Sequence, residues 1–187
     1  MSYAAPRQIH PSSITPPPGT TNAMSYCFSI HSKARYLNNL GPNATKDKFR
    51  GIYNTIFWYW FPANRGYIIG NHPLAKGGES KSLMVRHGGL PDPILIVKVE
   101  APSEWTETGR QTVMDELADQ IKEGFDHTQY KTIYGLGGIG LHWVVCKMES
   151  GDDQPTIVLD WQDDVSSDAS YSGFEIIADL VYNIASG

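Results

Sequence analysis

The sequence predicts a single α/β domain in which a mixed central β-sheet is flanked by helices. Three observations lead to this fold class. The chain has 187 residues, 41% of them are hydrophobic, and amphipathic helical segments alternate with short strand-like runs. A chain of this length can form one ordinary domain with a substantial core and is too short for two. Helices and strands in such an order bury their apolar faces by packing the helices on a sheet.

The first clear helix is predicted over residues 46–61, preceded by a capping segment at residues 43–45 and ended by Pro62. Its large apolar residues recur at helical spacing: Phe49, Ile52, Tyr53, Ile56, Phe57 and Trp60. An aromatic stripe at this spacing is typical of a helix face that packs on a core. We therefore interpret these rings as core residues.

Six strands and two further helices follow in the prediction. The strands cover residues 66–70, 82–86, 93–100, 132–135, 141–148 and 156–161. The strand at 93–100 is the clearest, because Pro-containing pairs bound it on both sides. The second helix begins at Ser103 and runs to Phe125, with Glu104 and Glu107 in a first turn where negative charge suits the helix dipole. The last helix covers roughly residues 171–185.

The residue order of the glycine-rich segment 135–140 is similar to that of a dinucleotide-binding loop. Such a loop must lead from a strand into a helix, so that the helix N-terminus meets the phosphates. Here the segment leads into the strand predicted at 141–148. We interpret residues 137–140 as a bent hairpin turn between two strands.

Charge and cysteine content narrow the classes of function. The formal net charge of −5 provides no overall positive field for nucleic acid, which argues against a protein that coats DNA but leaves room for a local basic groove. Cys27 and Cys146 are far apart and have apolar neighbours, so we expect two buried free thiols. Neither the cysteines nor the six histidines have the spacing of a zinc site.

The N-terminal residues 1–22 are rich in Pro, Ser and Thr, and we expect a flexible arm before a domain at residues 23–187. The first residues lack the apolar region of a secretory signal. No apolar run approaches the roughly 20 residues of a membrane span. The sequence thus predicts an intracellular protein, in the cytoplasm or nucleus, that does not contact a membrane.

The strand at 93–100 carries the most informative pair of charges. Lys98 and Glu100 are two residues apart, so their side chains project to the same face of a strand. One interpretation is an edge strand whose polar face lies in water. The other is a catalytic pair, in which the carboxylate binds a divalent metal and the ammonium stabilises developing charge.

The order of these features over about residues 46–160 resembles the PD-(D/E)xK nuclease superfamily, including its fungal members. In that layout a helix precedes three strands, the third strand carries an acid and a lysine two residues apart, and a second helix follows. The resemblance implies a restriction-endonuclease-like core and a phosphodiester hydrolase that uses Mg²⁺ or Mn²⁺. The chain departs from the family in two respects. Lys98 precedes Glu100 where the family has the acid first, and residues 79–82, where the family has a metal-binding aspartate, offer only Glu79 as an acid.

The resemblance also implies roles for particular residues. Lys98, Glu100 and Gln111 would be catalytic, with Gln111 reaching the site from the second helix. Glu79 and Glu100 would hold the metal. Asp92 is less favoured as a ligand, because on an extended strand it would lie about 20 Å from Lys98.

Two hypotheses for the function stay open. The first is an atypical or degenerate metal-dependent nuclease that acts on or binds nucleic acid. The second is a catalytically inactive nuclease-fold module for a protein partner, as in a defence or interaction protein. The nuclease mechanism needs at least two carboxylates near one metal ion, and the sequence guarantees only Glu100. A carbohydrate-binding role for the five tryptophans ranks last, because no sequence repeat supports it.

Overall fold

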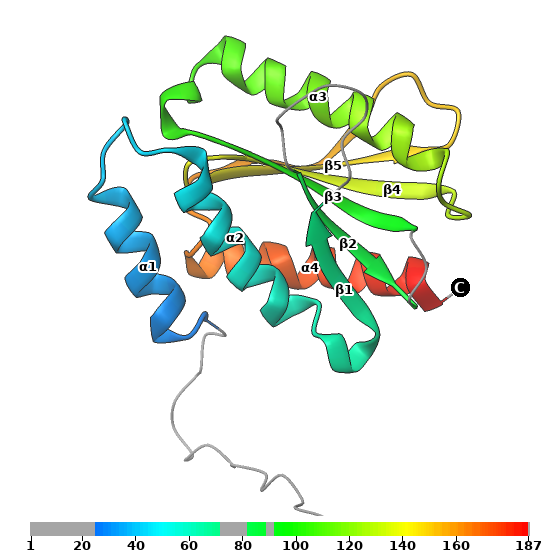
Figure 1. Cartoon of the computed structure of the whole chain (residues 1–187), viewed down its shortest axis with the longest axis horizontal. Coiled ribbons are helices and arrows are strands. Elements are labelled where there is room, and N and C mark those ends of the chain that lie inside the picture. Colours follow the sequence, from blue (N-terminus) through cyan, green and yellow to red (C-terminus); the bar gives the residue numbers. More distant parts are fainter. Residues whose placement is uncertain (1–24, 72–81, 89–91, 187) are drawn as a thin grey trace, which may run out of the picture.

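The computed structural model describes residues 25–71, 82–88 and 92–186, and these form a six-stranded mixed sheet with four α-helices (Figure 1). The predicted α/β class is confirmed. The predicted arm at residues 1–22 lies outside the described residues. In chain order the elements are α1 (Phe28–Asn38), α2 (Lys46–Trp60), η1 (Ala63–Arg65), β1 (Tyr67–Asn71), β2 (Leu83–His87), β3 (Pro93–Glu100), η2 (Pro102–Glu104), α3 (Glu107–Phe125), β4 (Thr132–Ile139), β5 (His142–Glu149), β6 (Thr156–Gln162) and α4 (Asp168–Ser186).

The sheet has the strand order β1-β2-β3-β4-β5-β6, and only β3 and β4 are parallel neighbours. A parallel pair needs a crossover connection, which α3 provides. Glu100 at the end of β3 is in register with Ile139 at the end of β4. The carboxyl ends of both strands therefore meet at one edge of the sheet, where open sheets leave room for ligands.

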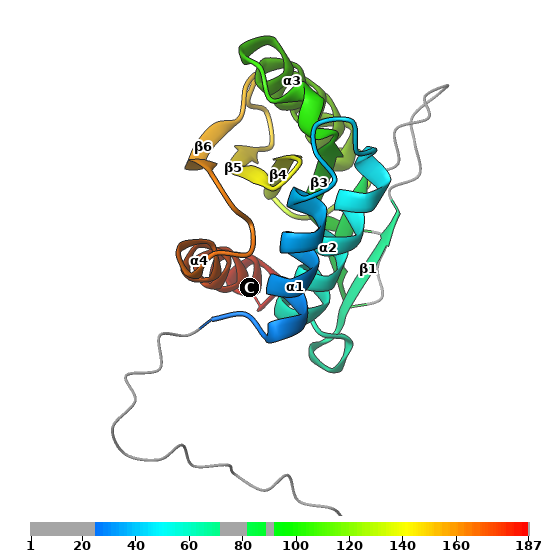
Figure 2. The same cartoon turned by 90° about the vertical axis from the view of Figure 1, so that its left-hand side faces the viewer.

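Helix α3 covers one face of the sheet, and α1, α2 and α4 cover the other (Figures 1 and 2). The residues of β3 divide between these layers. Leu95, Val97 and Val99 belong to the core shared with α1, α2 and α4, whereas Ile96 packs in the core beneath α3. Because side chains alternate along a strand, Lys98 and Glu100 project to the same side as Ile96. Both charged residues therefore face α3.

The aromatic stripe of α2 is buried against the sheet, which confirms its interpretation as core. Phe49, Ile52, Tyr53, Ile56 and Phe57 are all buried. The Tyr53 hydroxyl donates a hydrogen bond of 2.9 Å to the backbone carbonyl of His142 at the start of β5. This bond satisfies the phenol inside the core and ties α2 to the edge of the sheet where β3 ends.

Helix α1 was not predicted, and it also corrects the expectation for Cys27. Its buried residues Ile30, Ala34 and Leu37 recur at helical spacing, but the stripe is narrow and contains a small alanine. Cys27 is the N-cap residue of α1 and is exposed. The expectation of two buried thiols is therefore wrong for Cys27, because its apolar neighbours do not enclose it, and right for Cys146.

The hairpin predicted for the glycine-rich segment is confirmed, but its turn is shorter. Gly137 and Gly138 lie inside β4, and the turn begins at Gly140, whose φ of 61° favours glycine. A Cβ atom at Gly138 would lie 2.7 Å from the Tyr53 ring. Glycine in the strand thus allows α2 to approach the sheet closely.

Candidate functional site

Lys98 and Glu100 form an ion pair on the face of β3 that α3 covers. The Lys98 Nζ atom lies 2.9 Å from a Glu100 carboxylate oxygen, and the Lys98 side chain is only 3% exposed. The predicted shared face is confirmed. Strand β3 lies between β2 and β4, so the interpretation as an exposed pair on an edge strand is wrong.

A second carboxylate approaches Lys98 from α3. The Glu116 Oε2 atom lies 2.5 Å from Lys98 Nζ. Sequence reasoning missed Glu116, although a signal was present. Glu116 follows Val113 by three residues and precedes Leu117, and both of these belong to the buried stripe of α3. A charged residue on the margin of such a stripe is positioned to meet a charge on the sheet.

Lys46 completes the group, which we call the Lys98 cluster: Lys98, Glu100, Glu116 and Lys46. The Lys46 Nζ atom, in the first residue of α2, lies 3.5 Å from Glu100. The exposed side-chain fraction rises from 3% at Lys98 and 19% at Glu100 to 41% at Lys46 and 46% at Glu116. The cluster is therefore anchored in the interior and opens to solvent through Glu116 and Lys46.

The charge state of Lys98 follows from these contacts. Burial opposes an ammonium and is the largest single influence on the Lys98 pKa. Hydrogen bonds and charge interactions with Glu116 and Glu100 act in the opposite direction and together outweigh burial, so the pKa is raised. Lys98 is therefore an ammonium at neutral pH.

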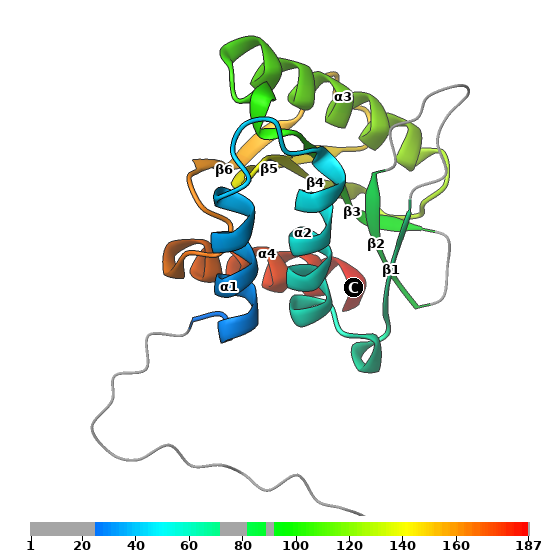
Figure 3. The same ribbon diagram turned by 60° about the vertical axis from the view of Figure 1, so that its left-hand side comes forward.

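A pocket of about 210 Å³ lies beside the cluster and is lined by Glu100, Glu104, Gly109, Thr112, Val113 and Glu116. Figure 3 shows the first turn of α2 and the start of α3 at this same end of the sheet. Glu100 and Glu116 bring two carboxylates together in this pocket, and carboxylate oxygens are donors of the kind that Mg²⁺ and Mn²⁺ prefer. The buried ammonium beside them can stabilise negative charge that develops in the pocket.

Of the other predicted site residues, Gln111 and Asp92 make their hydrogen bonds outside the Lys98 cluster. Gln111 is exposed on α3 and donates a 2.8 Å hydrogen bond to Asp115, so Glu116 is the α3 residue that contacts Lys98. Asp92 precedes β3 and accepts a bond of 3.4 Å from the backbone N–H of Gln129. Glu79 lies outside the described residues.

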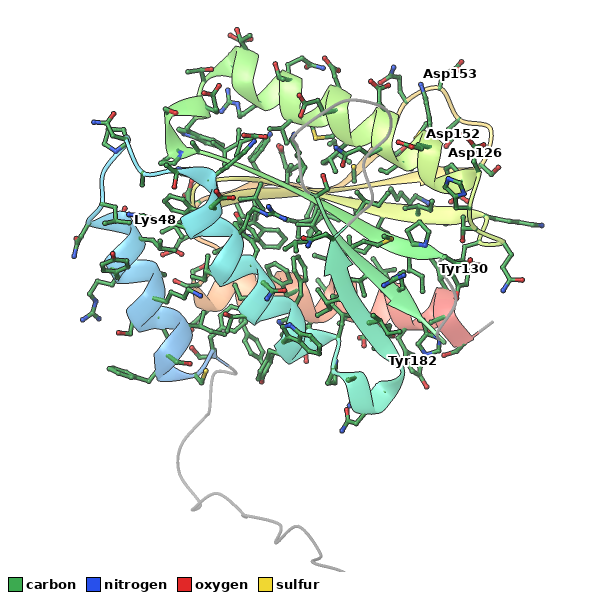
Figure 4. All side chains as sticks on the ribbon, viewed as in Figure 1. Lys48, Asp126, Tyr130, Asp152, Asp153 and Tyr182 are labelled. Carbon is green, nitrogen blue, oxygen red and sulfur yellow. The ribbon has the colours of Figure 1, made fainter. Side chains whose placement is uncertain are left out.

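Asp92 and the cluster are at opposite ends of β3. The residue after Gln129 is Tyr130, and Figure 4 shows Tyr130 at the end of the molecule opposite Lys48 in the first turn of α2. Lys46, which pairs with Glu100, belongs to that same first turn. The structure thus keeps Asp92 away from Glu100, as expected for the two ends of an extended strand.

No family model matches the chain, and no curated protein or solved structure matches it either. Within residues 25–71, 82–88 and 92–186, no three or more His, Cys, Asp and Glu side chains form a group that could hold a metal ion. No helix in this described part of the chain is long and apolar enough to cross a membrane.

Proposed function

We propose that this domain is an atypical metal-dependent nuclease-like protein, and that the Lys98 cluster acts on a phosphodiester bond of nucleic acid. The proposal is carried by one observation: the Lys98 ammonium contacts carboxylates from two different elements, Glu100 on β3 and Glu116 on α3. Since both carboxylates touch one nitrogen atom, they lie side by side. Glu116 is thus the second carboxylate that the nuclease mechanism needs, and the sequence alone did not identify it.

The chemistry of these residues fits a hard divalent cation. Mg²⁺ is commonly bound through one or two carboxylates, with waters and substrate phosphates completing its coordination. Glu100 and Glu116 would hold the ion, and Glu104 lines the same pocket. When bound, such an ion polarises a phosphoryl oxygen and favours formation of a nucleophilic hydroxide.

The residues of the chain itself have separate roles in this proposal. Lys98, held as an ammonium, would stabilise negative charge on the phosphoryl group at the inner side of the pocket. Lys46 would contribute positive charge at the solvent side, where a polyanion approaches. Thr112 and Val113 form part of the wall of the same pocket.

The exchanged order of Lys98 and Glu100 is compatible with this assignment. The exchange moves the carboxylate by two positions, roughly 6–7 Å along the strand. Glu100 is therefore the last residue of β3, and Glu116 approaches the same ammonium from α3. The element order α2-β1-β2-β3-α3-β4 supports the proposed kinship with PD-(D/E)xK nucleases.

A second candidate function is a catalytically inactive module of the same fold that binds a protein partner. It is favoured by the charge balance of the Lys98 cluster, in which two ammonium groups pair with two carboxylates. Such a network is satisfied without any ligand and can serve to join a strand to a helix. In that case Lys98 would have a structural role.

Mn²⁺ titration separates the two candidates. Isothermal calorimetry on the wild-type chain should detect binding, and Glu100→Gln and Glu116→Gln should each weaken it by at least about tenfold, because each removes one charged ligand. Glu107→Gln is a matched control, since Glu107 is an exposed acid on the same helix and does not line the pocket. Gln111→Ala should also bind Mn²⁺ as the wild type does.

Cleavage of fluorescent single- and double-stranded oligonucleotides in Mn²⁺ provides the second measurement. The proposal expects slow, Mn²⁺-dependent cleavage that is lost in Glu116→Gln and kept in Glu107→Gln. Two results would contradict the proposed nuclease function: no Mn²⁺ binding by the wild-type chain, or normal Mn²⁺ binding by Glu116→Gln. Either result would leave the inactive partner-binding module as the remaining candidate.

A further inference from the structure

A second pocket, of about 490 Å³, lies at the same edge of the sheet as the Lys98 cluster, and its wall residue Trp105 directly follows Glu104, which lines the pocket beside the cluster. Two of its wall residues are close in sequence to the cluster, since Phe49 follows Lys46 by three residues on α2 and Pro102 follows Glu100 by two. Figure 2 shows the α1–α2 connection and the segment between β6 and α4 at this end of the molecule. A ligand that reaches the cluster can therefore extend into this pocket.

Aromatic rings form a preassembled wall of the pocket. The Trp105 and His142 rings are stacked, with centroids 3.8 Å apart and planes inclined by 8°. The Arg110 guanidinium lies 4.9 Å from the centroid of the Trp105 ring. The hydrogen bond from Tyr53 to the His142 carbonyl holds the start of β5 in place. Because His142 covers one face of Trp105 and Arg110 lies over the same ring, a flat ligand would stack on the outer face of His142, where a rigid ring costs little conformational entropy.

The polar groups of the pocket are mainly hydrogen-bond acceptors. Asp164 Oδ1 accepts from the backbone N–H and the hydroxyl of Ser166, at 2.8 Å each. Among the described residues no hydrogen bond reaches Asp164 Oδ2, which leaves this oxygen for a donor on a ligand. The Asp163 carboxylate is fully exposed at the rim, 3.8 Å from His142 Nδ1.

His142 adds a neutral ring to these carboxylates. Burial is the main influence on the His142 pKa and lowers it, although Asp163 and Asp164 act in the opposite direction. The His142 Nδ1 atom is buried and makes no hydrogen bond within the described part of the chain. The pocket thus combines flat rings, apolar walls and carboxylate acceptors, and its ligand should be flat and carry amino donors.

We propose that this pocket is a base subsite of the nuclease-like site and binds an unpaired nucleobase with an exocyclic amino group, such as cytosine or adenine. The assignment rests on the proposed function, because the adjoining cluster would hold the neighbouring phosphate. A carboxylate accepts well from the amino group of cytosine. Uracil has a carbonyl oxygen at that position, and the carboxylates repel it. Proteins that read unpaired bases combine such edge contacts with aromatic stacking.

Matched nucleotides test the base preference. The full chain is titrated with CMP and UMP in EDTA, so that no metal contributes, and the dissociation constants are measured by equilibrium dialysis. CMP should bind at least about tenfold more tightly than UMP, the discrimination expected of one good base-edge contact. AMP and inosine monophosphate form a second pair, because AMP carries an amino group where inosine monophosphate has a carbonyl oxygen. AMP should bind more tightly.

Two variants assign the preference to the pocket. Asp164→Asn keeps an Oδ1 acceptor for Ser166 but places an amide NH₂ toward the ligand, so the CMP-to-UMP ratio should fall to about one. Asp153→Asn is the control, because Asp153 is an exposed acid in the β5–β6 connection, and Figure 4 shows it at the end of the molecule opposite Lys48, which precedes the pocket residue Phe49. Thermal unfolding verifies that both variants are folded.

Three results would overturn the base subsite: no nucleotide binding by the wild type, equal affinity for CMP and UMP, or an unchanged ratio in Asp164→Asn. Tighter binding of Nα-acetylarginine amide than of CMP would also overturn it, by identifying a guanidinium site. A CMP preference in a chain without Mn²⁺ binding or cleavage would support the base pocket and contradict the nuclease proposal. Cleavage without a base preference would support the nuclease proposal and contradict the base subsite.

Discussion

The Lys98 ammonium on β3 lies 2.5 Å from the Glu116 carboxylate on α3, and this contact joins the sheet to the helix that crosses over it. Lys98 is almost fully buried, whereas Glu116 is nearly half exposed. The ammonium also holds Glu100 at 2.9 Å. Removing the lysine therefore leaves two neighbouring carboxylates without their shared cation.

Lys98→Met should destabilise the protein for this reason. Breaking a buried ion pair from one side typically costs 3–5 kcal/mol, and the exposure of Glu116 to water reduces the expected loss here to about 2 kcal/mol. Urea unfolding at pH 7 measures the change. Adding Glu116→Gln should restore about 1 kcal/mol of it, because the two sites are coupled. Lys131→Met, at an exposed position, should change stability by less than about 0.5 kcal/mol. Wild-type stability in Lys98→Met would show that the contact does not contribute.

His142 should make the protein less stable in mild acid. Its folded-state pKa is lowered from 6.5, mainly by burial, so the unfolded chain binds a proton more readily than the folded chain does. The stabilising effect is fully present above pH 6.5 and is lost as the pH falls from there through the folded pKa. Urea unfolding at pH 7.5, 6.5 and 5.5 should show a smaller pH-dependent loss in His142→Gln than in the wild type. Equal losses in the two proteins would assign the acid sensitivity to other groups.

The two thiols should react at very different rates. Cys27 is exposed, and its pKa is lowered chiefly by its 2.9 Å hydrogen bond with the Ser29 hydroxyl. Burial raises the pKa of Cys146 to about 12. Because the thiolate is the reactive form, Ellman's reagent at pH 7 should modify one thiol per native chain rapidly and the second only after unfolding. Cys27→Ser should abolish the rapid phase, and Ser29→Ala should slow it. Two rapid thiols in the native chain would contradict the burial of Cys146.

Gly138→Ala should destabilise the contact between β4 and α2. The added Cβ atom would lie 2.7 Å from the Tyr53 ring, and overpacking of this kind typically costs roughly 1–3 kcal/mol. Gly70→Ala on β1 is the matched control, because its Cβ atom would meet nothing closer than 3.4 Å. The cost of Gly138→Ala should shrink in a Tyr53→Ala background, where the ring is absent. An equal cost in both backgrounds would show that the ring is not the obstacle.

The sequence alone determined the features that depend on local periodicity. The bounds of β3 at residues 93–100 and the start of α2 at Lys46 agree with the prediction, since proline stops and helical spacing are signals within a few residues. The shared face of Lys98 and Glu100 likewise follows from the two-residue repeat of a strand. Helix α1 lacked such a signal, because three small or medium apolar residues form its whole buried stripe.

The tertiary structure decided which partners meet. That β3 is a central strand, that Lys98 faces α3, and that Glu116 rather than Gln111 contacts it all depend on how the crossover helix packs on the sheet. Glu116 and Gln111 are five residues apart on one helix, so a rotation about the helix axis selects between them. The apolar spacing of Val113, Leu117 and Ile121 places Glu116 at the margin of the buried stripe, but only the packing of this stripe against strands distant in sequence brings Glu116 to Lys98. Contacts between distant segments therefore determined the composition of the candidate site.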